Sequence, residues 1–137
     1  MHPSTVPIGP GSVHFFDLTN HTGISKHTIK DPHFVTVVMN GRLLSRNGHQ
    51  TIICVPMTSF RPEIHWDNDK GVMRSFYHHL LEARKYPILD HDTVVKCEQI
   101  FTINREYFNG NYRFPLEKDD LMEIRKKIAG VIGIGGV

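Results

Sequence analysis

Cysteine is scarce in this sequence. The two cysteines, Cys54 and Cys97, each lie in an apolar, β-branched stretch. Small secreted domains that depend on disulfides carry more cysteine for their length, so the sequence argues against a disulfide scaffold. We expect two buried free thiols and a reducing, cytoplasmic setting.

Long hydrophobic runs are also missing. The most apolar segment, residues 129–137, is far shorter than the roughly 20 residues that a membrane helix needs. Residues 1–11 are rich in proline and glycine and lack the charged-then-apolar order of a signal sequence. The sequence therefore predicts no membrane association.

The charge balance has little excess of either sign. The formal net charge is +2, with 22% charged and 39% hydrophobic residues. These proportions are typical of a globular domain, and they give no compositional signal for nucleic acid. A chain of 137 residues is sufficient for one core, so we expect a single domain over residues 1–137, with residues 1–10 as a flexible leader.

Short β-type segments dominate the first two thirds of the chain. Alternating or β-branched residues predict strands at 12–18, 34–39, 51–55, 93–97 and 100–103. The segments 34–39 and 51–55 are nearly all apolar, as expected of strands buried on both faces. Residues 76–81 fit either a strand or a helix, and Pro87 ends that segment.

Near the C-terminus the period of apolar residues changes to that of a helix. Leu121, Ile124 and Ile128 lie on one face, and Leu116 is placed to pack against Leu121 around a start near Glu117. The charged residues at 123 and 125–127 then form a solvated face. The sequence predicts a mainly β fold, a small, highly curved sheet or barrel with one C-terminal amphipathic helix packed on it.

One polar group stands out within the apolar segments. Lys96 and Glu98 are two residues apart on a segment expected to be extended, so their side chains point to the same face. Thr58 follows Pro56, which we expect to close the strand 51–55. A cation, a carboxylate and a hydroxyl together are suited to acid–base chemistry on a phosphodiester, which suggests RNA.

The ten histidines do not show the spacing of a metal site, neither in the pair His78 and His79 nor at His91. We therefore predict no metal and no cofactor. Phe60, Arg61 and Trp66 follow the Thr58 segment, and two interpretations are open for them. Aromatic side chains beside cations stack on RNA bases, but they also close the end of a barrel.

The order of these features resembles the MazF/PemK (Kid-like) toxins of type II toxin–antitoxin systems. The segment 11–18 (GSVHFFDL) is similar to the glycine-led opening strand of the family, and 56–59 (PMTS) to its Pro-x-Thr-Ser element. The segment 94–104 (VVKCEQIFTIN) is similar to the family's Val-x-Arg/Leu-Cys-Asp-Gln-x-x-Thr-Ile-Asp run. The C-terminal helix completes the resemblance.

This resemblance implies an SH3-like barrel of the CcdB/MazF type that forms a homodimer. It implies a growth-inhibiting toxin that acts as a sequence-selective, metal-independent endoribonuclease on single-stranded RNA and is inhibited by a cognate antitoxin protein. In the family's chemistry the ribose 2′-hydroxyl attacks the adjacent phosphorus and leaves a 2′,3′-cyclic phosphate and a 5′-hydroxyl.

The resemblance also implies roles for individual residues. Glu98 stands in the place of an aspartate that acts as general base, for which a pKa raised toward neutrality is optimal. Lys96 stands in the place of an arginine that stabilises the phosphate or protonates the leaving oxygen, and Thr58 donates a hydrogen bond to a phosphate oxygen. The RNA-binding residues expected around these three are Lys30, His14, Ser59, Arg61 and Gln99.

One position departs from the family pattern. An Arg-Pro pair is usual at the entrance to the second strand, and here the pair is Asp31 and Pro32. A carboxylate there repels phosphate, so Lys30, Lys26 or His33 would have to supply the missing positive charge.

This departure keeps two alternatives open. One is a plain RNA-binding module with altered catalysis, and the other is a gyrase-targeting interaction protein on the same fold. An RNase degrades purified RNA alone, whereas a gyrase poison acts only when gyrase is present.

Overall fold

The computed structural model describes residues 8–17, 32–45 and 50–134. Along the chain its elements are β1 (Ser12–Phe16), β2 (His33–Val37), α1 (Gly41–Leu44), β3 (Thr51–Ser59), α2 (Pro62–His65), β4 (Trp66–Asp67), β5 (Val72–Met73), β6 (His78–Leu81), β7 (Thr93–Lys96), β8 (Phe101–Asn104), the 3-10 helix η1 (Arg105–Phe108), β9 (Tyr112–Pro115) and α3 (Lys118–Val131). The predicted mainly β fold with a C-terminal helix is confirmed.

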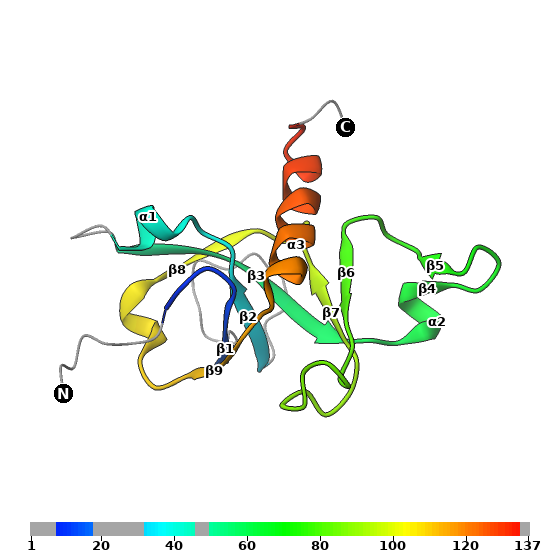
Figure 1. Ribbon diagram of the computed structural model, residues 1–137, viewed down its shortest axis with the longest axis horizontal. Coiled ribbons are helices and arrows are strands. Elements are labelled where there is room, and N and C mark those ends of the chain that lie inside the picture. The colour runs from blue at the N-terminus through cyan, green and yellow to red at the C-terminus, as the bar shows by residue number, and fades with distance from the viewer. Residues whose placement is uncertain (1–7, 18–31, 46–49, 135–137) are drawn as a thin grey trace.

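The described strands form one curled antiparallel sheet and one small hairpin. The sheet follows the order β6-β7-β3-β2-β1-β9, and β8 pairs with β3 beside this path. Figure 1 shows α3, in orange, standing against the curved sheet, while the hairpin of β4 and β5 extends from one end. The sheet therefore has the form of a half-barrel, with β6 and β9 as its end strands.

Strand β3 is the central element, and it changes partners along its length. Its first residues, 51–54, pair with β8, whereas 57–59 pair with β7 on the same side. Val38 donates its N–H to the carbonyl of Ile53, so the alternate positions 53, 55 and 57 bond toward β2. Position 56 therefore faces the junction between β8 and β7, where no N–H is needed, and proline is tolerated there.

Pro56 thus does not close the strand, as the sequence predicted, because β3 continues to Ser59. Both faces of the central strands are buried, as predicted. One core includes Val55, Met57, Val95 and Ile124 of α3, and the other includes Val35, Cys54 and Phe108.

The N-terminus of α3 is held where the sequence predicted. Glu117 is the residue before the helix, and Leu116 and Leu121 both lie against Gly11. Gly11 has φ of +83° and accepts the Leu116 N–H through its carbonyl at 2.8 Å. This contact fixes the helix against the start of β1.

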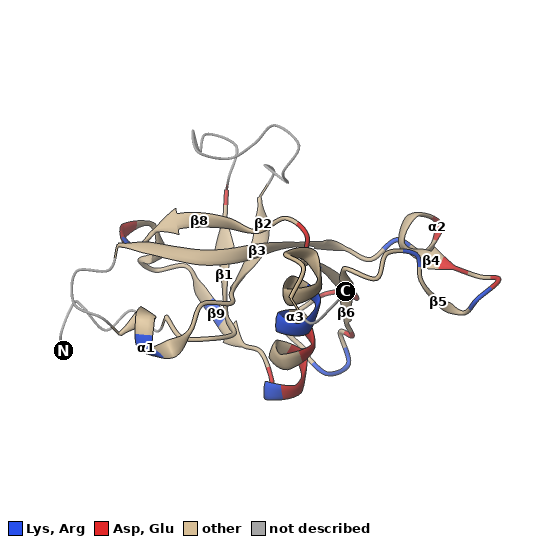
Figure 2. Cartoon of the chain, turned by 90° about the horizontal axis from the view of Figure 1, so that it is seen from above, with Lys and Arg blue, Asp and Glu red and all other residues tan. Residues whose placement is uncertain are grey.

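The charged face of α3 is less uniformly solvated than the sequence predicted. Figure 2 shows charged residues of both signs along the helix. Glu123 and Lys126 form an exposed pair at 3.3 Å, but Arg125 donates to the carbonyls of Val38 and Met39. The long arginine side chain reaches back to the sheet, so this part of the helix surface helps to attach it.

Other boundaries differ by a few residues from the prediction. The first strand ends at Phe16, and Leu18 lies outside the described residues. Residues 78–81 form a strand that ends at Leu81, well before Pro87, because the chain turns at 83–85. Over the described part of the chain, no helix has the length and apolar character to span a membrane.

Candidate functional site

Strand pairing brings Lys96 and Thr58 to one face of the sheet. Thr58 lies opposite Val94 on β7, and Lys96 is two residues farther along the same strand. His78 of β6 lies directly opposite Lys96. Because opposite residues of antiparallel strands share a face, Thr58, Lys96 and His78 all point to the same side of the sheet.

Glu98 reaches this group by a different route from the one predicted. Strand β7 ends at Lys96, and residues 97 and 98 form a turn that the Gln99 N–H closes on the Lys96 carbonyl at 3.1 Å. The prediction of a continuous extended segment is therefore wrong. The Glu98 carboxylate is nevertheless brought beside Lys96, because its Oε2 lies 3.0 Å from His78 Nε2.

The environment of Glu98 keeps it ionised. Burial acts to raise its pKa, but the hydrogen bond and the charge of His78 oppose this and lower the pKa below its ordinary value. Lys96 acts in the same direction. The expected rise toward neutrality is not found, because a hydrogen bond to the charged form of a carboxylate favours that form.

A second histidine covers this face. His65, at the end of α2, packs edge-on against His78 with ring centroids 5.7 Å apart. Its Nδ1 accepts the Arg61 N–H at 2.9 Å, which places the proton of the neutral ring on Nε2. Burial lowers the pKa of His65, and the charges of His78 and Lys96 lower it further.

Phe60, next to the end of β3, and Trp66 pack around His65 at the end of α2. Phe60 stacks on His65 with centroids 6.0 Å apart and contacts Trp66 edge-on at 6.4 Å. Both aromatic residues are half-buried, whereas Arg61 is exposed beside them. These contacts fit a packing role for the two aromatic residues.

The remaining predicted RNA contacts are divided between surface and interior. Ser59 Oγ lies 2.7 Å from His91 Nε2 at the end of β3. Gln99 is half-buried, and within the described structure its Oε1 is enclosed with no hydrogen-bond partner. Lys30, together with Lys26 and Asp31, lies outside the described residues, whereas Pro32 and His33 line a pocket next to Thr58.

His14 has an interior position. Its side chain is 0% exposed, its Nε2 lies 2.8 Å from Ser12 Oγ, and its Nδ1 lies 3.1 Å from Asn111 Oδ1. Burial lowers its pKa to about 4, so the ring is neutral at pH 7. Both ring nitrogens have partners inside the protein, so the predicted contact with RNA does not fit this position.

A second polar group, which the sequence interpretation missed, joins α3 to β6 and the loop 82–92. The Asp120 carboxylate is bonded by His79 Nε2 at 2.8 Å, by the Tyr86 hydroxyl and by Lys85 Nζ at 2.9 Å. Burial acts to raise the pKa of Asp120, but these bonds reverse the effect and lower it. Asp120 is in the first turn of α3, where acidic residues are ordinary, so its type and position carry no separate signal of this group.

Both cysteine thiols are free and buried. Burial raises the pKa of Cys97 to about 12 and raises that of Cys54 still further. Neither thiol is therefore a nucleophile at neutral pH. Among the described residues, no three His, Cys, Asp or Glu side chains come together as a metal site would require.

Thr58, Lys96 and Glu98 thus lie together on one polar face of a half-barrel with a C-terminal helix. Residues 10–132 match the model of the family described as PemK-like, MazF-like toxin of type II toxin–antitoxin system. The match spans most of the chain, so the protein belongs to this family. A search of curated proteins finds no match.

Several solved structures share this fold. MazF from Deinococcus radiodurans is 18% identical, with a TM-score of 0.63 over 93% of this chain and 97% of that one. An endoribonuclease in complex with its cognate antitoxin, from a Mycobacterial species, is 14% identical, with a TM-score of 0.61 over 91% of this chain and 94% of that one. The MazE-MazF structure from Deinococcus radiodurans is 14% identical, with a TM-score of 0.59 over 95% of this chain and 99% of that one.

Proposed function

We propose that this protein is the toxin of a type II toxin–antitoxin system and acts as a sequence-selective, metal-independent endoribonuclease on single-stranded RNA. The observation that carries the proposal is the convergence of Thr58, Lys96 and Glu98 on one face of the sheet, although they come from a strand, a second strand and a turn. Family membership supports the same chemistry.

In this mechanism Glu98 takes the proton of the ribose 2′-hydroxyl as that oxygen attacks phosphorus. A carboxylate with a lowered pKa is ionised at pH 7 and so is ready to accept a proton, although it is a weaker base than one tuned to neutrality. His78 acts as a positioning residue, because its hydrogen bond fixes the direction of the carboxylate.

Lys96 supplies positive charge to the phosphate as negative charge develops in the transition state, and Thr58 donates a hydrogen bond to a phosphate oxygen. The ammonium lacks the planar fork of the arginine that some family members have here, so it acts as a point charge and fixes the phosphate less tightly. The P–O5′ bond breaks as the 2′-oxygen bonds to phosphorus, and the leaving 5′-oxygen takes a proton from Lys96 or from water, which gives a 2′,3′-cyclic phosphate and a 5′-hydroxyl.

The partners follow from the same proposal. A cognate antitoxin protein inhibits the toxin, in keeping with the two similar structures whose titles name such complexes. The active species is a cytoplasmic homodimer. The gyrase-targeting alternative has no supporting observation in this chain, whereas the three converging side chains favour RNA.

The test is incubation of the purified, antitoxin-free protein with a long single-stranded RNA in excess EDTA, followed by mapping of the product ends. Discrete cuts that leave 5′-hydroxyls are expected. Saturable binding to RNA without products at any pH between about 6 and 8 would instead establish a binding module. Full cleavage that requires added metal would contradict the mechanism.

A further inference from the structure

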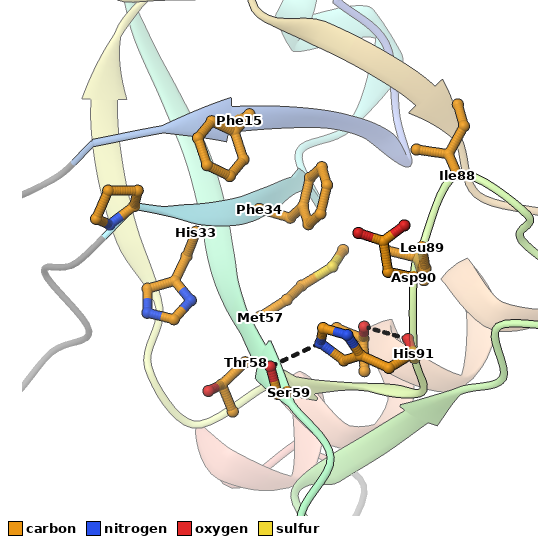
Figure 3. A pocket seen from close by; sticks show the side chains of 12 residues that line it. Phe15, His33, Phe34, Met57, Thr58, Ser59, Ile88, Leu89, Asp90 and His91 are labelled. Atoms are coloured by element: carbon orange, nitrogen blue, oxygen red, sulfur yellow. Dashed lines mark hydrogen bonds between the residues drawn. The ribbon is translucent and has the colours of Figure 1, made fainter.

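A pocket of about 220 Å³ lies where β1 and β3 end and β2 begins, on the opposite face of the sheet from Lys96. Thr58 and Ser59 are successive strand residues, so they point to opposite faces. Figure 3 shows Ser59 directed toward His91 and Thr58 directed away from it. Thr58 thus borders both the pocket and the face of the sheet that carries Lys96 and His78.

The walls of the pocket are apolar and aromatic. Phe15 and Phe34 meet edge-on with ring centroids 5.3 Å apart, and the buried Met57 lies beneath them (Figure 3). Ile88 forms part of the opposite wall and is 50% exposed. A cavity of this size is smaller than the ~300–1,000 Å³ of most drug-sized ligand sites, and it is suited to one flat ring system.

The polar groups of the pocket either accept hydrogen bonds or can both donate and accept them. Asp90, Ser59 and His91 lie on one side, and Figure 3 shows the Asp90 carboxylate turned toward Phe34. None of the described lining residues is a lysine or an arginine. The Asp90 carboxylate is an acceptor, so this side of the pocket favours a ring that donates hydrogen bonds.

The loop that carries these groups is held in place at several points. The Asp92 carboxylate accepts the Ala83 N–H at 2.8 Å, and the Asp92 carbonyl accepts the Phe60 N–H at 2.9 Å. Leu89, the residue before Asp90, is 4% exposed and belongs to the core that includes Ile124 of α3. A wall fixed in this way is formed before any ligand arrives, which lowers the cost of binding.

We propose that this pocket is a nucleobase subsite that accepts one unpaired base with an exocyclic amino group, stacked against Phe15 or Phe34 and donating to Asp90. Aromatic faces and base-edge hydrogen bonds are how proteins recognise splayed single-stranded RNA. Carboxylates accept from amino groups such as N4 of cytosine, and uracil has no such group. The inference rests on the proposed action on single-stranded RNA, and it adds that uracil, whose edge donates only through its N3–H, is disfavoured at one position flanking the cut.

The experiment uses a pool of single-stranded RNAs randomised around the cleavage position, with the products sequenced. The wild type should disfavour uracil at one flanking position. Ile88→Trp, which fills the pocket from an exposed site, and Asp90→Asn should each reduce that discrimination about fivefold or more, with other positions unchanged. Ile132→Trp, a matched change at a 60% exposed residue at the end of α3, should keep the wild-type profile.

An unchanged profile in Ile88→Trp and Asp90→Asn would overturn the subsite. If the wild type does not cut RNA at all, the nuclease proposal fails, and titration of the labelled protein with cytidine and with uridine tests the pocket separately. Shifts of the Ser59, Ile88 and His91 amide resonances with cytidine, and weaker ones with uridine, would support the subsite. Equal shifts with both nucleosides, or none, would overturn it.

Discussion

His78 Nε2 lies 3.0 Å from Glu98 Oε2, so the proposed general base is held by a residue from the neighbouring edge strand. An ionised carboxylate only accepts hydrogen bonds, so the imidazole donates this one through Nε2. The bond sets both the direction of the carboxylate and its ionisation. His78 therefore acts through Glu98, and the first two predictions concern this pair.

Glu98→Gln should reduce RNA cleavage by roughly 10²- to 10⁴-fold, because the amide cannot take a proton from the 2′-hydroxyl. The thermal unfolding midpoint should change little, since the amide still accepts from His78. Cleavage rates in EDTA measure the effect, with Glu106→Gln, an exposed glutamate on η1, as matched control. Unchanged cleavage in Glu98→Gln would remove this residue from the mechanism.

His78→Ala should move the acidic limb of the pH–rate profile to higher pH. His78 lowers the pKa of Glu98, so its removal lets that pKa rise, and the carboxylate becomes protonated at a higher pH. His78→Gln should shift the limb less, because glutamine keeps an N–H donor at a similar reach. Rates measured from about pH 4 to 8 separate the two variants. Identical profiles for alanine and glutamine would show that the donor does not act on Glu98.

Asp120→Asn should lower the free energy of unfolding at pH 7 by about 1–2 kcal/mol, because three partners lose a charged acceptor. The pKa of Asp120 is lowered in the folded state, so its stabilisation is present above the ordinary value of 3.8 and is lost as the pH falls through the folded value. The difference between the two proteins should therefore shrink in acid.

Urea unfolding at several pH values measures this difference. Asp119→Asn is the matched control, because that side chain is 73% exposed and contacts only Lys85 among these partners. A difference between wild type and Asp120→Asn that stays constant down to about pH 3 would contradict the assigned cause.

The native protein should not react with a thiol reagent at pH 8 over minutes, whereas the unfolded protein should give two thiols. Burial raises the pKa of Cys97 to about 12, and the reactive species is the thiolate. A colorimetric thiol assay with and without guanidinium makes the comparison. Rapid reaction of one thiol in the native state would indicate that its strand opens locally.

The sequence was sufficient for the class of fold because the relevant signals were local. β-branched runs located β1, β2, β3, β7 and β8 but not β4, β5 or β9, and helical spacing with the Leu116 and Leu121 contact located α3 to within a residue. The resemblance carried the assignment to the toxin family. The end of β7 at Lys96 was missed because the turn at residues 97 and 98 contains no glycine or proline to mark it. The chain also continues in the same direction along β3, from β7 to β8.

The site could be predicted only in part, since its remaining members depend on pairing between distant segments. His78 meets Lys96 only through the register of β6 on β7, and His65 arrives from α2. Neither contact has a sequence spacing that reveals it. His14 shows the opposite case, because a polar residue on an alternating strand gave no indication that Asn111 would satisfy it in the interior.

Pro56 has a consequence for the placement of the proposed catalytic groups. The register that pairs Met57 with Val95 places Pro56 opposite Lys96, and because the proline has no N–H, the pairing of β3 with β7 ends there. The chain is then free to turn at residues 97 and 98, and this turn brings the Glu98 carboxylate to His78.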